Sequence, residues 1–278
     1  MTVTGRSGAS GRHHKPFLPW AVHRRPELLT VPLVFLLLIA GWEAAVGYYA
    51  IEAFILPGPT AIASELAEGV AAGYFASHAL VTAMEMLLGF LIGAGLGLVI
   101  GAAVSQYPLV EKTFFAYLVG LQTVPKLAIA PLIIVWFGFG MESKVFIAAL
   151  IVFFPVVVNV LEGFQSTDHR QLDMLRAMGT TRWQLFHMVK LPNALPYIFV
   201  GLNIGVVMAI LGAVVGEFVG AQEGLGYLIL QYNYQLKVAR VFAILIILAA
   251  LGITLHTLVR ILHRRVVFWR RPDHKVEA

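Results

Sequence analysis

The stretch ALVTAMEMLLGFLIGAGLGLVIGAAV, residues 79–104, contains one charged side chain, Glu85, in 26 positions. A helix of about 20 mostly apolar residues is long enough to cross the hydrocarbon core of a bilayer. A helix on the surface of a soluble protein would carry a polar face along its length, which this stretch lacks. The segment therefore predicts a membrane-spanning helix.

Five further stretches have similar length and composition. They extend over residues 28–49, 114–139, 145–161, 194–219 and 241–259. Of the 278 residues, 59% are hydrophobic and 13% are charged, whereas roughly a quarter of an ordinary soluble domain is charged. The sequence predicts an all-α integral membrane protein with about six transmembrane helices.

The distribution of basic residues predicts the orientation of these helices. With six spans both termini share one side, which carries sixteen Lys and Arg against three on the other side. Positively charged loops are retained in the cytoplasm, so we expect both termini to be cytoplasmic. The net charge of +5 comes from residues beside membrane-length segments. It therefore indicates contact with membrane lipid, not with nucleic acid.

The polar and apolar segments together divide the chain into four parts. We expect a cytoplasmic tail, a first transmembrane helix with an external segment, the main transmembrane domain and a second cytoplasmic tail. These parts cover residues 1–26, 27–76, 77–262 and 263–278, respectively.

Several classes of site are excluded or disfavoured by composition. The chain has no cysteine, which rules out disulfides, thiolate metal sites and cysteine nucleophiles. His13 and His14 lie among basic residues in the N-terminal tail, where a polar tail is a simpler interpretation than a metal site. No Gly-x-x-x-x-Gly-Lys-Ser/Thr phosphate loop occurs, and no intramembrane histidine cluster or paired carboxylate motif indicates a membrane enzyme. We therefore expect no metal, no cofactor and no enzymatic activity in this chain.

Small residues recur at helical spacing in two of the predicted spans. Glycines at every fourth position line one face of residues 79–104, and a similar pair opens the fifth span; they are Gly89, Gly93, Gly97, Gly101, Gly201 and Gly205. Such faces let another helix backbone approach closely. The pattern favours tight helix packing over a direct role in gating.

The third predicted span contains both a helix breaker and a cation within the membrane. Pro125 interrupts the helix, and broken backbone at membrane depth must face protein or a watery cavity. Lys126 follows it, with Gln122 one turn before, so these three residues are candidates for the translocation pathway. Lys126 could instead extend to the cytoplasmic interface. Glu85 and Glu217 are further pathway candidates, which could pair with Lys126, hydrogen-bond to the backbone or reach an interface.

A polar, basic and helix-prone segment lies between the fourth and fifth spans, at about residues 164–193. Asp168 is a candidate N-cap, and Gly179 followed by two threonines predicts a division into two short helices. The apolar residues recur at amphipathic spacing. The pair could dock a partner protein or lie on the membrane surface.

The spacing within this segment resembles the EAA loop of permeases in binding-protein-dependent ABC importers. That loop reads Glu-Ala-Ala, three residues, Gly, nine residues, Ile, any residue and Leu-Pro. Here Asp173-Met174-Leu175 stands for the first three positions, followed by Gly179, Val189 and Leu191-Pro192. The substitutions at the first three positions leave the contacts of the first helix open.

Four other runs resemble the nitrate, sulfonate and taurine permease group, which also includes permeases for pyrimidine precursors of thiamine and for riboflavin. They are Thr123-Val124-Pro125-Lys126-Leu127-Ala128, Trp136-Phe137-Gly138-Phe139-Gly140, Gly216-Glu217-Phe218-Val219-Gly220 and Gly224-Leu225-Gly226-Tyr227. Together with the loop they extend the resemblance over about residues 77–262.

The resemblance implies the fold of a type I ABC importer permease in the bacterial inner membrane. It also implies a second permease copy, two ATPase subunits that carry ATP and Mg²⁺, and an external substrate-binding protein. The ATPases would dock at the loop through Asp173, Arg176, Ala177, Met178, Gly179, Trp183, Leu191 and Pro192. The solute would be small and polar or anionic, such as a sulfonate, taurine, nitrate or a pyrimidine precursor. The alternative is a secondary transporter or channel with an ion site at Lys126, Glu85 and Glu217.

Overall fold

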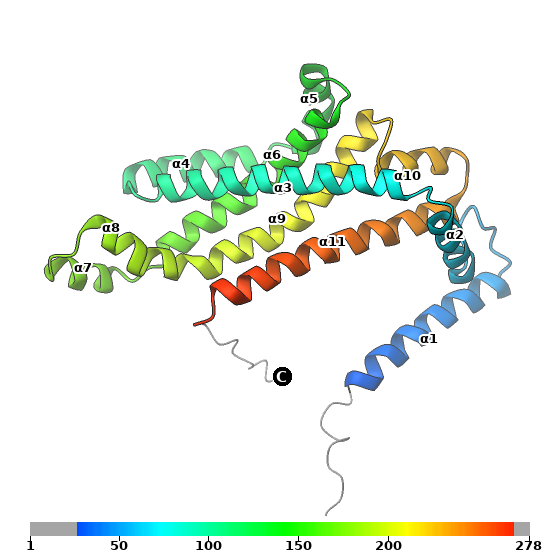
Figure 1. Ribbon diagram of the computed structural model, residues 1–278, viewed down its shortest axis with the longest axis horizontal. Helices are drawn as coiled ribbons and strands as arrows, with labels where there is room; N and C mark the ends of the chain where they lie inside the picture. The colour runs from blue at the N-terminus through cyan, green and yellow to red at the C-terminus, as the bar shows by residue number, and fades with distance from the viewer. Residues whose placement is uncertain (1–26, 270–278) are drawn as a thin grey trace, which may run out of the picture. The chain divides into compact units, whose positions relative to one another are not determined.

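Figure 1 shows the computed structural model, which describes residues 27–269. The predicted tail at 1–26 with His13 and His14, and the end of the second tail at 270–278, lie outside the described residues. Residues 27–269 form helices joined by turns, without any strand. This agrees with the all-α prediction.

The helices follow one another with short connections. In chain order they are α1 (Glu27–Tyr48), α2 (Pro59–Ala71), α3 (Ala76–Val104), α4 (Pro108–Gln122), a 3-10 turn (Lys126–Ile129), α5 (Ala130–Phe137), α6 (Met141–Gln165), α7 (His169–Ala177), α8 (Arg182–Leu185), a π-helical turn (Phe186–Lys190), α9 (Leu191–Gly220), α10 (Leu225–Tyr234) and α11 (Val238–Val266).

The chain divides into two compact units, residues 1–50 and 51–278. The described part of the first unit contains α1, whose segment Thr30–Tyr48 is long and apolar enough to cross a membrane. Its large apolar side chains are exposed; Val31 and Leu38, for example, are each 67% exposed. Lipid tails are the solvent in which such a surface is stable.

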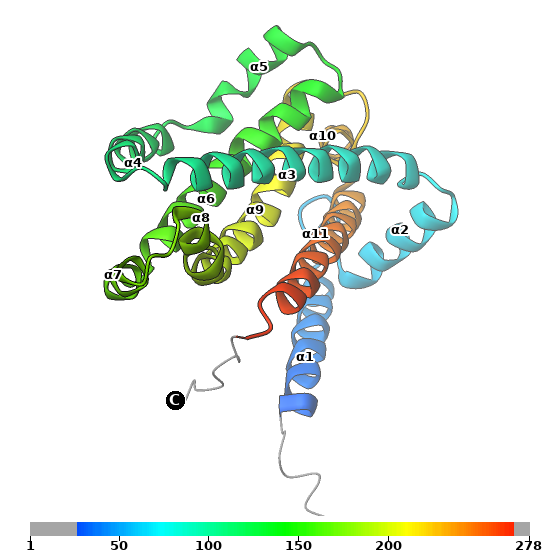
Figure 2. The ribbon, with the colours of Figure 1, turned by 60° about the vertical axis from the view of Figure 1, so that its left-hand side comes forward.

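The core of the second unit is formed where α3, α6 and α9 pack against one another. Helix α6 is the most deeply buried of the long helices, because α3 and α9 both cover it. Its fully buried apolar side chains include Val152, Val156, Val157, Val160 and Leu161. Helix α11 packs along α9, and both views of the ribbon show these helices side by side (Figures 1 and 2).

The predicted glycine faces lie at the contacts of α6 with α3 and α9. A Cβ atom on Gly97 would stand 2.9 Å from Val156 Cγ1, and one on Gly101 would stand 2.6 Å from Val160 Cγ1. On α9, a Cβ on Gly201 would stand 2.8 Å from Asn159 Cβ. The other three face α6 in the same way; they are Gly89, Gly93 and Gly205. The helix axes approach as closely as they do because these positions have no side chain.

The third predicted span is two helices instead of one. The segments Leu109–Gln122 and Lys126–Phe137 meet at an angle of 74° across a short break. Pro125, which has an extended backbone, cannot continue α4, and Pro131 is accommodated in the first turn of α5. The described residues therefore contain five helices that can cross a membrane, or six if the bent pair is one span.

Candidate functional site

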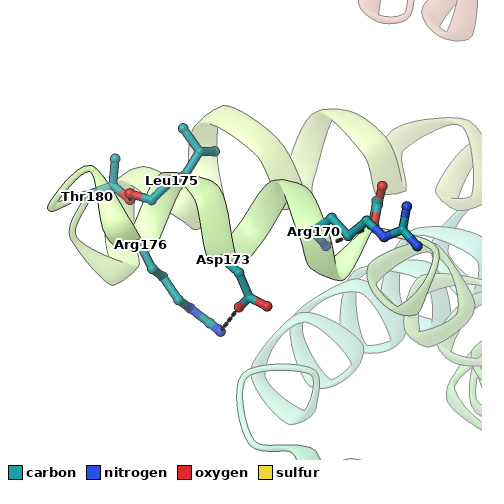
Figure 3. Close-up of polar contacts among 6 residues, drawn as sticks. Arg170, Asp173, Leu175, Arg176 and Thr180 are labelled. Atoms are coloured by element: carbon teal, nitrogen blue, oxygen red, sulfur yellow. Dashed lines mark hydrogen bonds and ion pairs between the residues drawn. The ribbon is translucent and has the colours of Figure 1, made fainter.

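The first candidate site is the loop that carries α7 and α8, which lie at one end of the second unit while α10 lies at the other (Figures 1 and 2). Asp168 is the N-cap of α7, as predicted, and its carboxylate accepts a hydrogen bond from the Arg170 amide at 2.9 Å. The C-terminus of α7 is closed by Gly179 at φ +81°, which lets the Thr180 amide and hydroxyl both donate to the Leu175 carbonyl. Figure 3 shows these contacts.

The second helix of the loop begins with a capping box. The Thr181 hydroxyl accepts from the Gln184 amide while the Gln184 side chain accepts from the Thr181 amide. The sequence predicts that the loop segment ends near residue 193 and that the fifth span begins at 194. The structure instead continues from α8 through the π-helical turn into α9, so that Arg182–Gly220 is one helical run of 39 residues. Pro192 lies in the first turn of α9, directly after the π-helical turn, and the helical run continues through it.

The loop presents large apolar side chains outward. Met178 is 73% exposed and Trp183 is 68% exposed, while Leu172 and Leu185 face inward and are buried. Met174 and Met188 belong to the exposed set as well. Asp173 and Arg176 form an exposed ion pair at 3.1 Å, drawn in Figure 3. Of the other predicted docking residues, Ala177 and Gly179 are exposed, and Leu191 and Pro192 are half-buried at the start of α9. Both helices that carry this exposed surface are capped at their N-termini.

The second candidate site is a pocket of about 340 Å³ beside the broken span. Its lining residues come from α4, the 3-10 turn, α6 and α9; they are Gln122, Lys126, Leu127, Ile151, Phe154, Pro155, Ile204, Met208 and Leu211. The Lys126 ammonium lies 4.3 Å from the centre of the Phe154 ring, which is a cation–π distance. Pro125 directly precedes the 3-10 turn, without lining the pocket itself. The pocket therefore joins one cation and one amide to an apolar wall.

The third candidate site is a buried polar cluster that joins α3, α6, α9 and the start of α10. Glu85, Glu217 and Lys144 are 2%, 1% and 3% exposed, respectively. The Thr82 hydroxyl donates to Glu217 Oε1 at 2.5 Å and accepts from the Leu225 amide at 2.8 Å. The Lys144 ammonium donates to the carbonyl of Gly140 at 2.9 Å and interacts electrostatically with both carboxyls.

Two glycines allow the chain to wrap around Glu217. The Gly226 amide donates to Glu217 Oε2, and a Cβ on Gly226 would stand 2.6 Å from that oxygen. Gly224 has φ +111°, a conformation that other residues rarely adopt, and its amide donates to His78 Nδ1 at 3.0 Å. The two runs at 216–220 and 224–227 are therefore one structural feature.

For these charges the structure decides against one of the alternatives, pairing with Lys126, and corrects one assignment. The cation beside Glu85 and Glu217 is Lys144, and no interaction between described residues joins Lys126 to either carboxyl. Lys144 is one of the three basic residues that the orientation argument assigns to the side opposite the termini, and it lies buried in the first turn of α6. One signal for this site was present in the sequence. His78, Thr82 and Glu85 are spaced so that they share one face of α3.

A bundle of membrane-length helices with a broken span, an open pocket beside the break and an exposed loop of two capped helices is typical of a multi-pass membrane transport subunit. The family profile described as "Binding-protein-dependent transport system inner membrane component" matches residues 93–268. The chain belongs to this family. It is an ABC transporter permease subunit for the import of small solutes and a multi-pass protein of the bacterial inner membrane.

Three curated relatives match most of the chain. The riboflavin transport system permease protein RibX of Chloroflexus aurantiacus is 36% identical over 87% of this chain and 90% of its own length. The putative aliphatic sulfonates transport permease protein SsuC of Bacillus subtilis is 36% identical over 84% of each chain. The formylaminopyrimidine transport permease protein ThiX of Halalkalibacterium halodurans is 33% identical over 90% of this chain and 99% of its own.

A solved structure has the same fold. A crystal structure of an amino acid ABC transporter aligns with a TM-score of 0.55 over 72% of this chain and 97% of the other, at 22% identity. The permease fold predicted from the loop motif is thereby confirmed.

Proposed function

We propose that this chain forms the translocation pathway of an ATP-driven importer and that its α7–α8 loop docks a separate ATPase subunit. The observation that carries the proposal is the outward display of Met178 and Trp183 on two capped helices. Large apolar side chains exposed to water on a rigid support are typical of a protein docking surface. The loop lies at the end of the helical run that continues into α9, so a movement of the loop is passed to the bundle.

The pathway proposal is supported by the pocket at the broken span. A lysine beside hydrocarbon is costly unless it is paired or hydrated, and Lys126 lies against the Phe154 ring with Gln122 nearby. We infer that Lys126 and Gln122 contact the solute during passage and that Pro125 maintains the break. Glu85 and Glu217 stay candidates for a role in transport, which they would exert through the buried polar cluster and not from the pocket.

The solute follows from the chemistry of the pocket and the names of the relatives. RibX, SsuC and ThiX are named for riboflavin, aliphatic sulfonates and formylaminopyrimidine, which all present oxygen atoms beside an apolar or aromatic part. One cation, one amide and an apolar wall suit such a molecule. We propose a small organic solute of this kind, with a polar or anionic end.

The assembly that we propose contains two permease chains, two ATPase subunits and an external substrate-binding protein. Membership of the binding-protein-dependent family supports the last two partners. ATP and Mg²⁺ would be bound by the ATPase subunits. The predicted orientation would place the α7–α8 loop in the cytoplasm, where ATP is available.

The test is affinity purification of this chain from its native membrane, with mass spectrometry to detect any ATPase subunit that stays bound. We expect the double variant Arg176→Glu, Trp183→Ala to lose ATPase association while its insertion in the membrane is unchanged, because it removes an exposed aromatic and reverses an exposed charge. The matched control is Arg264→Glu, Phe268→Ala, which makes the same changes on exposed residues at the end of α11. Normal association of the first variant would remove the loop from its docking role.

A further inference from the structure

A basic cleft lies under the α7–α8 loop, outside the transport pathway, and Arg176 is the one residue that it shares with the proposed docking surface. It has a volume of about 680 Å³ and is formed by the ends of α3 and α6, the first turns of α4 and the loop. Its lining residues are Ser105, Glu111, Lys112, Phe115, Phe164, Gln165, Thr167, Leu172, Arg176 and Lys190. A neighbouring hollow shares Arg176 and Lys190 with it and adds Arg182.

The charges of this cleft favour an anion. Three cations line it, namely Lys112, Arg176 and Lys190, while Glu111 is the one carboxylate in its lining. Arg176 donates one of its N–H groups to Asp173, which leaves other donors of the same guanidinium free for a ligand. Cations that have been brought together in this way repel one another, and an anion between them lowers the energy.

Two buried polar atoms in the cleft point independently to a ligand. Thr167 is only 4% exposed, and within residues 27–269 its hydroxyl has no hydrogen-bond partner. Glu111 Oε1 is also buried and without a partner in the same range. A buried polar group without a hydrogen bond is costly, so such groups are normally satisfied by something that binds. The Thr167 hydroxyl can donate a hydrogen bond to a ligand, and Glu111 Oε1 can accept one.

The lining of the cleft also has an apolar part. Phe115, Phe164 and Leu172 belong to it. A ligand that fits this lining has a phosphate for the cations and Thr167, a hydroxyl for Glu111 and an apolar part for the aromatic side chains. We propose that this cleft binds a phosphate-bearing anion. Two sources share this chemistry, namely the headgroup of an acidic phospholipid such as phosphatidylglycerol and free phosphate. The predicted orientation places the cleft at the cytoplasmic surface, at the level of lipid headgroups.

The experiment measures lipid binding to the purified full-length chain by native mass spectrometry. Phosphatidylglycerol and zwitterionic phosphatidylcholine are compared at equal concentrations, and radiolabelled inorganic phosphate is tested in a separate equilibrium assay. We expect phosphatidylglycerol to bind the Lys112→Gln, Lys190→Gln variant about tenfold more weakly than the wild type. The control, Arg264→Gln, Arg265→Gln, removes the same charge from the end of α11 and should change binding less than about twofold.

A second variant tests the buried hydroxyl without changing the charge. Thr167→Val keeps the shape of the side chain and should weaken phosphatidylglycerol binding several-fold with unchanged folding, because the hydroxyl no longer donates. If inorganic phosphate binds with the same dependence on Lys112, Lys190 and Thr167, the source is free phosphate and the proposal stands.

Two results would overturn the proposal. One is binding of both probes that does not change in either cleft variant. The other is loss of ATPase association in Lys112→Gln, Lys190→Gln with lipid and phosphate binding unaltered, which would assign these cations to an acidic segment of the ATPase. Neither result bears on the docking role of Trp183, which is tested separately.

Discussion

Lys126 is the residue on which the pathway proposal depends most directly. Its ammonium has an aromatic ring as its neighbour and a pocket beside it, and its backbone opens a 3-10 turn that is not part of either flanking helix. A charge in this position can contact a passing solute and still be hydrated between transport events.

Substitution of Lys126 should separate transport from assembly. Lys126→Met keeps the length of the side chain and removes the charge, so we expect uptake at limiting solute to fall about tenfold or more, with normal assembly. Lys126→Arg is the control that retains a cation. Uptake by vesicles and recovery of the assembled complex are the two measurements. Wild-type uptake by Lys126→Met would show that the lysine only extends to the membrane interface.

Unlike Lys126, Glu217 has both of its carboxylate oxygens engaged in hydrogen bonds within the protein. Glu217→Gln keeps the shape but offers one acceptor where Thr82 and Gly226 require two. We expect the variant to lose about 1–3 kcal/mol of stability. Thermal unfolding in detergent checks this, with Glu162→Gln at an exposed position of α6 as the control. An unchanged midpoint would mean that the hydrogen bonds of Glu217 do not stabilise the fold.

At the scale of helices, stability depends on contacts between α6 and its two neighbours. Gly97 and Gly95 offer a matched pair on α3, because a Cβ on Gly97 would meet Val156 whereas nothing lies within 4 Å of one on Gly95. We expect Gly97→Ala to cost about 1–3 kcal/mol through overpacking and Gly95→Ala to be near neutral. Thermal unfolding of both variants decides this. An equal loss of stability in both variants would show that the close contact of α3 with α6 is not what makes Gly97 necessary.

The long helices could be predicted from the sequence because a long apolar stretch is sufficient to indicate a membrane-spanning helix. The two loop helices could be predicted because Asp168 and Gly179 are local signals for a helix start and a helix end. The buried polar cluster was not predictable in the same way. Thr82 and Glu217 are 135 positions apart, and their contact exists only because α3 and α9 are neighbours. Lys144 is likewise ambiguous by itself, since a lysine at the start of a helix can face water or protein. The prolines predicted a break in the third span, but its 74° bend depends on packing against α6 and α9.

At the scale of the whole molecule, the orientation in the membrane is the largest untested prediction. The absence of cysteine makes the chain suitable for labelling at single introduced cysteines. Gln171→Cys in α7 and Gln222→Cys before α10 are both exposed positions at opposite ends of the second unit. In intact cells we expect a membrane-impermeant maleimide to label Gln222→Cys but not Gln171→Cys.

Permeabilised cells provide the control for this labelling. Both variants should react there, which would show that the protected cysteine is accessible once the membrane is open. The reverse labelling pattern in intact cells would show the opposite orientation in the membrane. The α7–α8 loop would then lie outside the cell, where it could not contact a cytoplasmic ATPase.

The unbroken run Arg182–Gly220 has a mechanical consequence. At a rise of about 1.5 Å per residue, 39 residues form a rod about 58 Å long. If such a rod pivots at one end, a tilt of about 5° displaces the other end by about 5 Å, close to the spacing of one helical turn. Trp183 lies near one end of this helical run and Glu217 near the other end. A displacement of a few ångströms at the loop would therefore reach the region of Glu217 if the run, which contains a π-helical turn and Pro196, moves as one body.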